Sequence, residues 1–92
     1  MGEKRKKEIK IGPTITWRKV NDEAVILNLE TSVYYSVNNT GTFIWELLAG
    51  GRPTGKIGLA LAEEYGISPE DAAADTAEFL DTMAELELTE AR

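Results

Sequence analysis

The sequence contains no histidine and no cysteine in its 92 residues. The lack of histidine removes the commonest general base and, together with the lack of cysteine, nearly every transition-metal site. The lack of cysteine also excludes disulfides and thiol nucleophiles, so the redox compartment cannot be read from the sequence. We therefore expect a chain that is not an enzyme and that binds no metal and no cofactor.

Long apolar runs are also missing. No segment approaches the ~20 apolar residues that span a bilayer, and the basic start MGEKRKKEIK is not followed by the apolar segment of a signal peptide. A chain of this length can bury one modest core. These features predict a one-domain protein in the cytoplasm, without a membrane span.

The net charge of −6 is unevenly distributed. Residues 1–20 contain seven basic and two acidic side chains, a balance of +5, whereas residues 53–92 contain ten acidic and two basic side chains, a balance of −8. A basic terminus of this kind is usually a solvated arm. We interpret residues 1–12 as a flexible basic arm and residues 13–90 as the folded domain.

Three short segments before residue 38 have the composition of β-strands. They are rich in β-branched and aromatic residues and are separated by the turn-like pairs Asn21-Asp22 and Glu30-Thr31. In the third segment, alternation places Val33, Tyr35 and Val37 on one face, which we expect to be the core face. The predicted strands, joined as an antiparallel sheet, are Thr14–Val20, Ala24–Leu29 and Ser32–Val37.

After these segments the apolar residues recur with helical spacing. A first helix is predicted from an N-cap at Asn38, Asn39 or Thr40 to a stop at Gly50-Gly51. Its apolar stripe consists of Phe43, Ile44, Leu47 and Leu48, with Trp45 on the flank of the stripe.

Two more helices follow. The second begins after Pro53 with Thr54 as its cap and ends at Gly66. Ser68 caps the third, and Pro69 takes its first position. The expected apolar positions are Ile57, Leu61 and Tyr65 in the second helix and Ala72, Thr76, Phe79, Leu80, Met83 and Leu86 in the third. The predicted fold class is therefore α+β, with three antiparallel strands followed by three helices.

The stretch GGRPTGKI, residues 50–57, is one residue short of a nucleotide-binding phosphate loop. Such a loop follows a buried strand and supplies a hydroxyl to Mg²⁺ from the residue after the lysine. Here the glycines follow a predicted helix, and Ile57 stands where the hydroxyl is required. We interpret the stretch as the end of one helix and the start of the next.

The order and spacing of several residues from about 20 to 88 resemble the PqqD-like family, the RiPP recognition elements that bind leader peptides of ribosomally made, modified natural products. The residues that carry the resemblance are Val37-Asn38, Gly41, Ile44-Trp45, Gly50, Thr54, Ile57 and the segment 75–86. The resemblance implies a winged-helix-like fold. It also implies that a leader peptide adds as a further strand to the edge of the third strand, in the cleft beside the third helix.

The residues themselves suit this mode of binding. The strand SVYYSV contains no charge and no proline that would protect an open edge from another strand. On the third helix, apolar side chains suit either a ligand pocket or the core, and acidic ones suit either a basic leader or solvent. The expected peptide-binding residues are Val33, Tyr34, Tyr35, Ser36, Val37, Asp75, Glu78, Phe79, Thr82, Met83 and Leu86.

Within the family, the chain most resembles the separate leader-binding subunit of a split lasso-peptide maturation protease. That resemblance implies partners: the precursor leader peptide, a cysteine leader peptidase and a macrolactam-forming cyclase. The alternatives are a peptide chaperone for pyrroloquinoline quinone or for another radical-SAM-modified peptide. The open edge could also pair with a second copy to form a homodimer.

Two other function classes match the sequence only in part. A winged-helix DNA-binding regulator would use the basic arm, but its recognition helix needs lysine or arginine, and the third helix here is acidic. We therefore expect no nucleic-acid partner. A small enzyme could use the carboxylate pairs Glu63-Glu64 or Asp81-Glu85, but no other convergent group completes a catalytic site.

Overall fold

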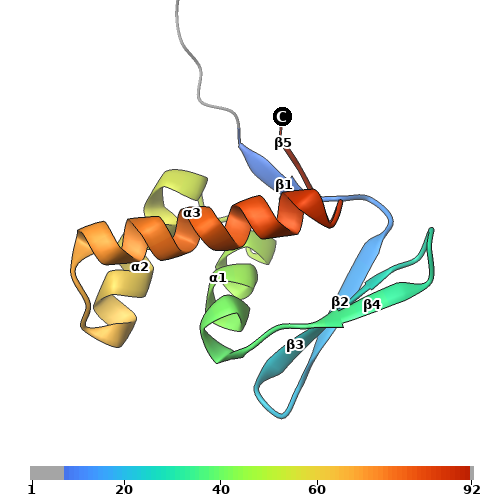
Figure 1. The fold of residues 1–92 in the computed structure, drawn as a ribbon, viewed down its shortest axis with the longest axis horizontal. Coiled ribbons are helices and arrows are strands. Elements are labelled where there is room, and N and C mark those ends of the chain that lie inside the picture. Colours follow the sequence, from blue (N-terminus) through green and yellow to red (C-terminus); the bar gives the residue numbers. More distant parts are fainter. Residues whose placement is uncertain (1–7, 92) are drawn as a thin grey trace, which may run out of the picture.

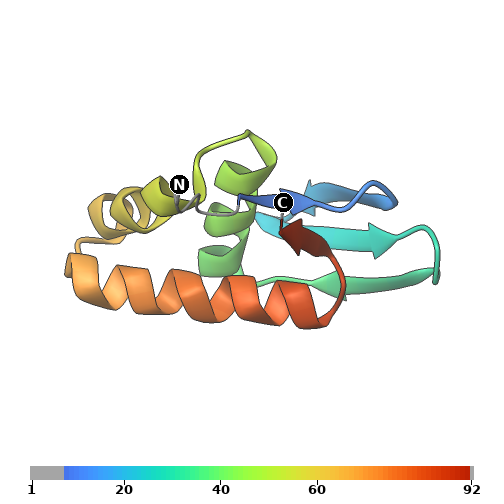
Figure 2. The ribbon, with the colours of Figure 1, turned by 90° about the horizontal axis from the view of Figure 1, so that it is seen from above.

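The computed structural model describes residues 8–91, which form two separate β-sheets and three helices. Strands β2, β3 and β4 form an antiparallel sheet in that order, and β1 pairs with β5. The sheet lies at one end of the molecule, and α3 runs along one side past α1 (Figures 1 and 2). This arrangement confirms the predicted α+β class. The elements are β1 Ile9–Ile11, β2 Ile15–Val20, β3 Glu23–Asn28, β4 Val33–Ser36, α1 Asn39–Ala49, α2 Thr54–Tyr65, α3 Pro69–Glu85 and β5 Thr89–Ala91.

The three strands of the larger sheet begin and end within one residue of their predicted bounds. Asn21 and Asp22 both have positive φ, 52° and 68°, as the two-residue hairpin turn between β2 and β3 requires. In the next turn, the Asn28 side-chain oxygen accepts hydrogen bonds from the N–H groups of Glu30 and Thr31, at 2.9 and 3.4 Å. Turn chemistry close to each strand therefore determines where the strands stop.

The inner face of this sheet is the one that packs on the helices. In β3 it carries Ala24, Ile26 and Asn28, all buried. Just beyond the end of β4, Val37 is also buried, as predicted, but Val33 is 45% exposed and does not lie in the core. Val33 follows the turn between β3 and β4, at the end of the sheet farthest from the helices (Figure 1), so no helix covers it.

The helix ends largely follow the predicted capping residues. Asn38 caps α1 by accepting the Gly41 N–H at 2.8 Å, and Ser68 caps α3 by accepting the Asp71 N–H at 3.0 Å. The prediction that Thr54 caps α2 is wrong, because the N-cap position is Pro53 and makes no side-chain capping bond. The Thr54 hydroxyl instead accepts the N–H of Ile9 at 3.3 Å, which ties α2 to β1.

Trp45 lies at the centre of the core. It is completely buried and packs edge-on against Trp17 of β2, with ring centroids 6.5 Å apart. The expectation that Trp45 lies on the flank of the α1 stripe is therefore wrong. Because the sheet and the other helices all pack against α1, burial extends beyond a single stripe. The largest fully buried side chains are Trp45, Ile26, Ile44, Ile57, Leu61 and Leu88.

The small sheet joins the two ends of the described chain. Ile9 pairs with Ala91 and Ile11 with Thr89, and the Gly12 N–H donates to the Leu88 carbonyl at 3.1 Å. Residues 9–11 are thus a paired strand, not part of a flexible arm, because Ile9 and Ile11 pack on the core and find a partner strand at the other end of the sequence. Residues 1–7 of the predicted arm lie outside the described residues.

Candidate functional site

Strand β4 is an edge of the sheet, because within residues 8–91 it pairs only with β3. The Val37 N–H donates to the Ala24 carbonyl at 2.9 Å. Since hydrogen-bonded and non-hydrogen-bonded pairs alternate in an antiparallel ladder, Tyr35 is the next residue bonded to β3. The backbone N–H and C=O groups of Tyr34 and Ser36 therefore point toward the free edge.

A groove begins where β4 ends. It lies between the first turn of α1 and the middle of α3, has a volume of about 260 Å³ and is open to solvent. A chain added along β4 would reach this groove within two residues of Ser36, because Asn38 is one of the lining residues. The groove is lined by Asn38, Thr40, Gly41, Ile44, Asp75, Glu78, Phe79 and Thr82.

The apolar part of the groove comes from two helices in close contact. A Cβ on Gly41 would lie 2.7 Å from Phe79 Cε1, so only glycine lets the Phe79 ring approach α1 this closely. Phe79 is half-buried, and Ile44 beside it is almost completely buried. The groove therefore presents one aromatic side chain backed by a rigid helix–helix contact.

The polar part of the groove is acidic. Asp75 and Glu78 are exposed and form no ion pair within 4.0 Å among the described residues. The Thr82 hydroxyl donates to the Glu78 carbonyl at 3.1 Å, so its proton is engaged within α3. No basic side chain lines the groove, and its charge favours a ligand with basic groups.

One ion pair outside the groove connects α1 with the sheet. Lys19 of β2 donates to the Glu46 carboxylate at 3.0 Å. This hydrogen bond, with the charge of Glu46, raises the pKa of Lys19 above its ordinary value of 10.5. Both side chains are partly exposed, so the pair contributes only modestly to the position of α1, whose first turn lines the groove.

The structure brings together most of the residues that the sequence pointed to. Asp75, Glu78, Phe79 and Thr82 line the groove, and β4 ends at Ser36, two residues before the lining residue Asn38. Met83 instead lies in the core, and Leu86 is half-buried against it at the end of α3. Four lining residues are not among the expected peptide-binding residues, although the sequence predicts that all four lie in or next to the first helix: Asn38, Thr40, Gly41 and Ile44.

The described part of the chain shows neither a metal site nor a membrane-spanning helix. Residues 8–91 contain no group of three or more histidine, cysteine or carboxylate side chains placed to hold a metal ion. No helix within that range is long and apolar enough to cross a membrane.

Comparison with known proteins gives a family and two similar structures. A family model described as coenzyme PQQ synthesis protein D (PqqD) matches residues 23–88. The structure "TbiB1 in Complex with the TbiA(beta) Leader Peptide" superposes with a TM-score of 0.84 at 32% identity, covering 88% of this chain and 94% of that one. No curated protein sequence matches this chain.

The second structure is "Lasso peptide synthetase B1 complexed with the leader peptide". It superposes with a TM-score of 0.82 at 23% identity, covering 90% of this chain and 98% of that one. At this identity the likeness concerns the fold alone. Both comparisons extend over nearly the whole described chain.

Proposed function

The chain belongs to the PqqD family of RiPP recognition elements, and from this premise we propose that it binds the leader peptide of a lasso-peptide precursor. In this proposal the domain of residues 13–90, extended by β1, captures the leader by strand addition to β4. The related TbiB1, 32% identical, is named as a complex with a leader peptide. The lasso assignment draws on the overall resemblance of the sequence.

The observation that carries the proposal is the continuity between the free edge of β4 and the groove. Backbone groups at Tyr34 and Ser36 can pair with an incoming strand, and the groove that starts at Asn38 can receive a side chain of that strand. Backbone pairing supplies affinity for an extended peptide, and pockets for alternate side chains supply specificity. Phe79 offers an apolar contact, while Asp75 and Glu78 favour a basic neighbour.

The proposed partners follow from the same premise. The chain presents the bound precursor to a cysteine leader peptidase and then to a cyclase, and does no chemistry itself. It works in the cytoplasm, where precursor peptides are synthesised. A leader from a pyrroloquinoline quinone or other radical-SAM pathway is the alternative ligand, and competition between synthetic leaders of these classes distinguishes them.

A titration of labelled leader peptide, followed by fluorescence anisotropy, tests the proposal. The leader comes from the precursor encoded beside this gene, and random duplex DNA serves as the comparison. We expect saturable binding of the leader and none of DNA, because α3 carries exposed carboxylates where a recognition helix carries cations. Binding of DNA alone, weakened steeply by salt, would favour a winged-helix regulator.

The same edge suits a second copy of the chain. Strand β4 has no charged residue and no proline that would oppose pairing with an identical strand. We propose that leader and second copy compete for this edge, so the leader dissociates any dimer. Sedimentation velocity with and without leader measures this, and a dimer that persists in saturating leader would contradict it.

A further inference from the structure

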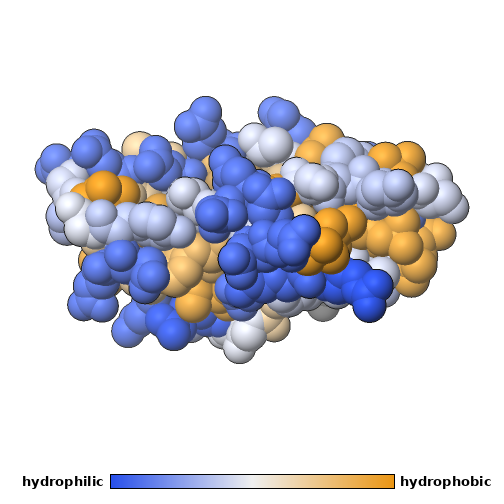
Figure 3. Space-filling model, turned by 90° about the horizontal axis from the view of Figure 1, so that it is seen from below, coloured by the Kyte–Doolittle hydropathy of each residue, from blue (hydrophilic) through white to orange (hydrophobic). Residues whose placement is uncertain are grey.

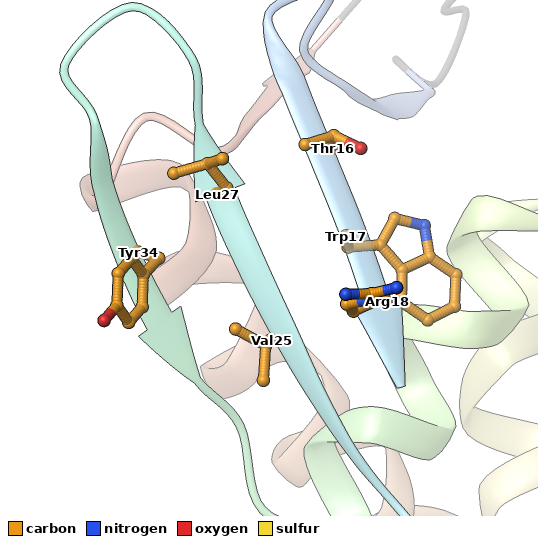
Figure 4. Close-up of a pocket in the computed structure, with 6 residues that line it drawn as sticks. All are labelled: Thr16, Trp17, Arg18, Val25, Leu27 and Tyr34. Atoms are coloured by element: carbon orange, nitrogen blue, oxygen red, sulfur yellow. The ribbon is translucent and has the colours of Figure 1, made fainter. Parts of the chain in front are cut away.

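The face of the sheet turned away from the helices carries a wide hollow of about 570 Å³. Its lining side chains come from all three strands: Thr16, Trp17, Arg18, Val25, Leu27 and Tyr34 (Figure 4). Figure 3 shows apolar side chains gathered at the end of the molecule that the sheet forms. Among the described residues, no polar side chain that lines this hollow is both buried and without a hydrogen-bond partner. The hollow therefore does not by itself specify what covers it.

A smaller hollow, the α2–α3 groove, lies between these two helices next to the start of β1. Its volume is about 320 Å³, and much of its wall consists of residues no larger than alanine: Gly55 and Gly58 of α2 and Ala73 and Ala77 of α3. Asp81, farther along α3, also lines the groove; it is exposed and forms no ion pair within residues 8–91. The groove can thus admit a backbone or a long side chain, and its charge favours a basic one.

Thr76 brings an unsatisfied hydroxyl to this groove. The residue is 5% exposed, and its Oγ1 atom makes no hydrogen bond among the described residues. A Cβ built on Gly58 would lie 3.8 Å from this oxygen, so the hydroxyl lies where α2 presents no side chain to it. A buried hydroxyl without a partner is unfavourable. Such a group indicates that another segment or ligand completes its hydrogen bonding.

The first described residues of the chain are attached to the same groove. Ile9 is one of the lining residues, and its N–H donates to the Thr54 hydroxyl at 3.3 Å. The Glu8 carboxylate accepts the Thr54 N–H at 3.5 Å. The seven residues that precede Glu8 in the sequence therefore join the fold at the edge of the groove. Their sequence, MGEKRKK, contains four basic side chains and one acidic one, which complements the charge of Asp81.

We propose that residues 1–7 dock in the α2–α3 groove as an extended continuation of β1. Seven extended residues span at most about 25 Å, whereas the helical rise from Ala73 to Asp81 is about 12 Å. The segment is thus long enough to cross the groove. This docking is a property of the chain beyond the leader binding proposed above, and it does not depend on a leader.

The polar groups of the groove assign roles within the segment. Alternation from Ile9 puts Lys7 on the groove side of an extended chain. There the Lys7 ammonium group pairs with Asp81, while its methylene chain covers the bare backbone at Gly58. A backbone N–H of the segment donates to Thr76 Oγ1, which leaves no buried hydroxyl unsatisfied.

The docked segment supports α3 from the side opposite the leader. Ala77 and Asp81 face the α2–α3 groove, whereas Glu78 and Thr82 line the groove that begins at the end of β4. One helix therefore separates the two sites. The segment and a leader peptide contact opposite faces of α3 and do not compete.

A spin label in the segment tests the docking. The chain has no cysteine, so Glu3→Cys provides a single labelling site in the full chain. Amide signals of the ¹⁵N-labelled protein are compared with the label paramagnetic and reduced. The same measurement is made with Asp81→Lys added, and with Glu63→Lys, which reverses the charge of an exposed residue of α2 outside the groove. Circular dichroism checks that each variant is folded.

We expect the label to weaken the amide signals of Gly58, Ala73 and Ala77 and to leave those of Thr40 and Gly41, in the groove beside β4, unchanged. Asp81→Lys should remove the effect and Glu63→Lys should keep it. No loss of signal at the α2–α3 groove, or an equal loss in Asp81→Lys, would overturn the proposal.

Two further outcomes would also overturn the docking within one chain. Loss of signal at Thr40 and Gly41 instead would place the segment in the groove beside β4. A loss that persists when spin-labelled ¹⁴N chains are mixed with unlabelled ¹⁵N chains would assign the contact to a second copy. Leader peptide is absent from these samples, so failure of the proposed function appears separately, in the anisotropy titration.

Discussion

Phe79 of α3 lies so close to Gly41 of α1 that a Cβ on Gly41 would stand 2.7 Å from its Cε1 atom and 3.2 Å from its Cδ1 atom. The same Cβ would also collide with Val37, just beyond the end of β4. Because glycine has no side chain, α1, α3 and the end of β4 can approach one another closely around the groove.

Gly41→Ala should disturb both the fold and the groove. Because Val37 is buried and cannot move freely, we expect a loss of about 1–3 kcal/mol in the free energy of unfolding and weaker leader binding. Gly55→Ala is the matched control, since nothing lies within 4 Å of its added Cβ, and it should leave stability unchanged or raise it by up to about 1 kcal/mol. Urea unfolding, monitored by Trp fluorescence, gives the unfolding free energy of both variants. Equal stability of Gly41→Ala and wild type would show that the contact is not tight.

Ser36→Pro should abolish strand addition while leaving the sheet folded. Proline removes the Ser36 N–H, which points away from β3, so no bond of the existing ladder is lost. We expect leader affinity to fall at least about tenfold, through one lost hydrogen bond and the clash of the ring with the added strand. Ser36→Ala keeps the N–H and serves as the control in the same anisotropy titration. Unchanged leader affinity in Ser36→Pro would rule out pairing along this edge.

Asp75→Asn combined with Glu78→Gln tests the acidic part of the groove. If basic leader residues contact these carboxylates, the double variant should bind leader two- to fivefold more weakly at low salt, and the difference should disappear near ~1 M salt. Glu63→Gln on the exposed face of α2 is the control. A double variant that binds as well as wild type at low salt would assign these carboxylates to solvent.

Thr42→Val should destabilise the protein because it removes two hydrogen bonds, and not because it changes the volume of the side chain. The buried Thr42 hydroxyl accepts the Ala24 N–H at 2.8 Å and donates to the Val37 carbonyl at 3.2 Å. Valine has nearly the same shape but leaves both backbone groups unsatisfied, so we expect a loss of about 2 kcal/mol. The exposed Thr40→Val is the control, and chemical denaturation measures both. If Thr42→Val loses no more unfolding free energy than Thr40→Val, water satisfies the two backbone groups in place of the hydroxyl.

Lys19→Gln should destabilise the protein slightly at neutral pH and not at high pH. The folded protein raises the pKa of Lys19 above 10.5, so the stability contributed by its pair with Glu46 is fully present below that pH and is lost as the pH rises through the folded pKa. The difference in unfolding free energy between wild type and variant, measured from pH 7 to 11.5, should shrink above 10.5. A difference that stays constant to pH 11.5 would assign the effect to packing of the side chain.

The strands, helices and most caps were predictable because their signals are local. Asn21-Asp22 suits a two-residue turn wherever it occurs, and Ser68 followed by Pro69 is a start signal that depends on one helical turn. The acidic and aromatic side chains of the groove were predictable from helical spacing, since Asp75, Glu78, Phe79 and Thr82 repeat at intervals of three and four.

The misplaced features all depend on contacts between distant residues. Threonine is a common N-cap residue, but the Thr54 hydroxyl accepts a hydrogen bond from the Ile9 N–H instead. Trp45 looks like a flank residue in the sequence of α1, but packing against several elements buries it. The strand Ile9–Ile11 could not be recognised in a basic segment, because its partner Thr89–Ala91 lies at the opposite end of the chain.

The sequence by itself determined the order of elements, the uncharged β4 and the acidic α3, because composition and periodicity act within a few residues. Only the tertiary structure decided that β4 remains an edge, that the groove begins at its end, and that Arg18 lies in an apolar hollow on the opposite face. These features depend on strand order and on the distance between helices. Such relations are settled by packing of the whole core, in which each element's position depends on all the others.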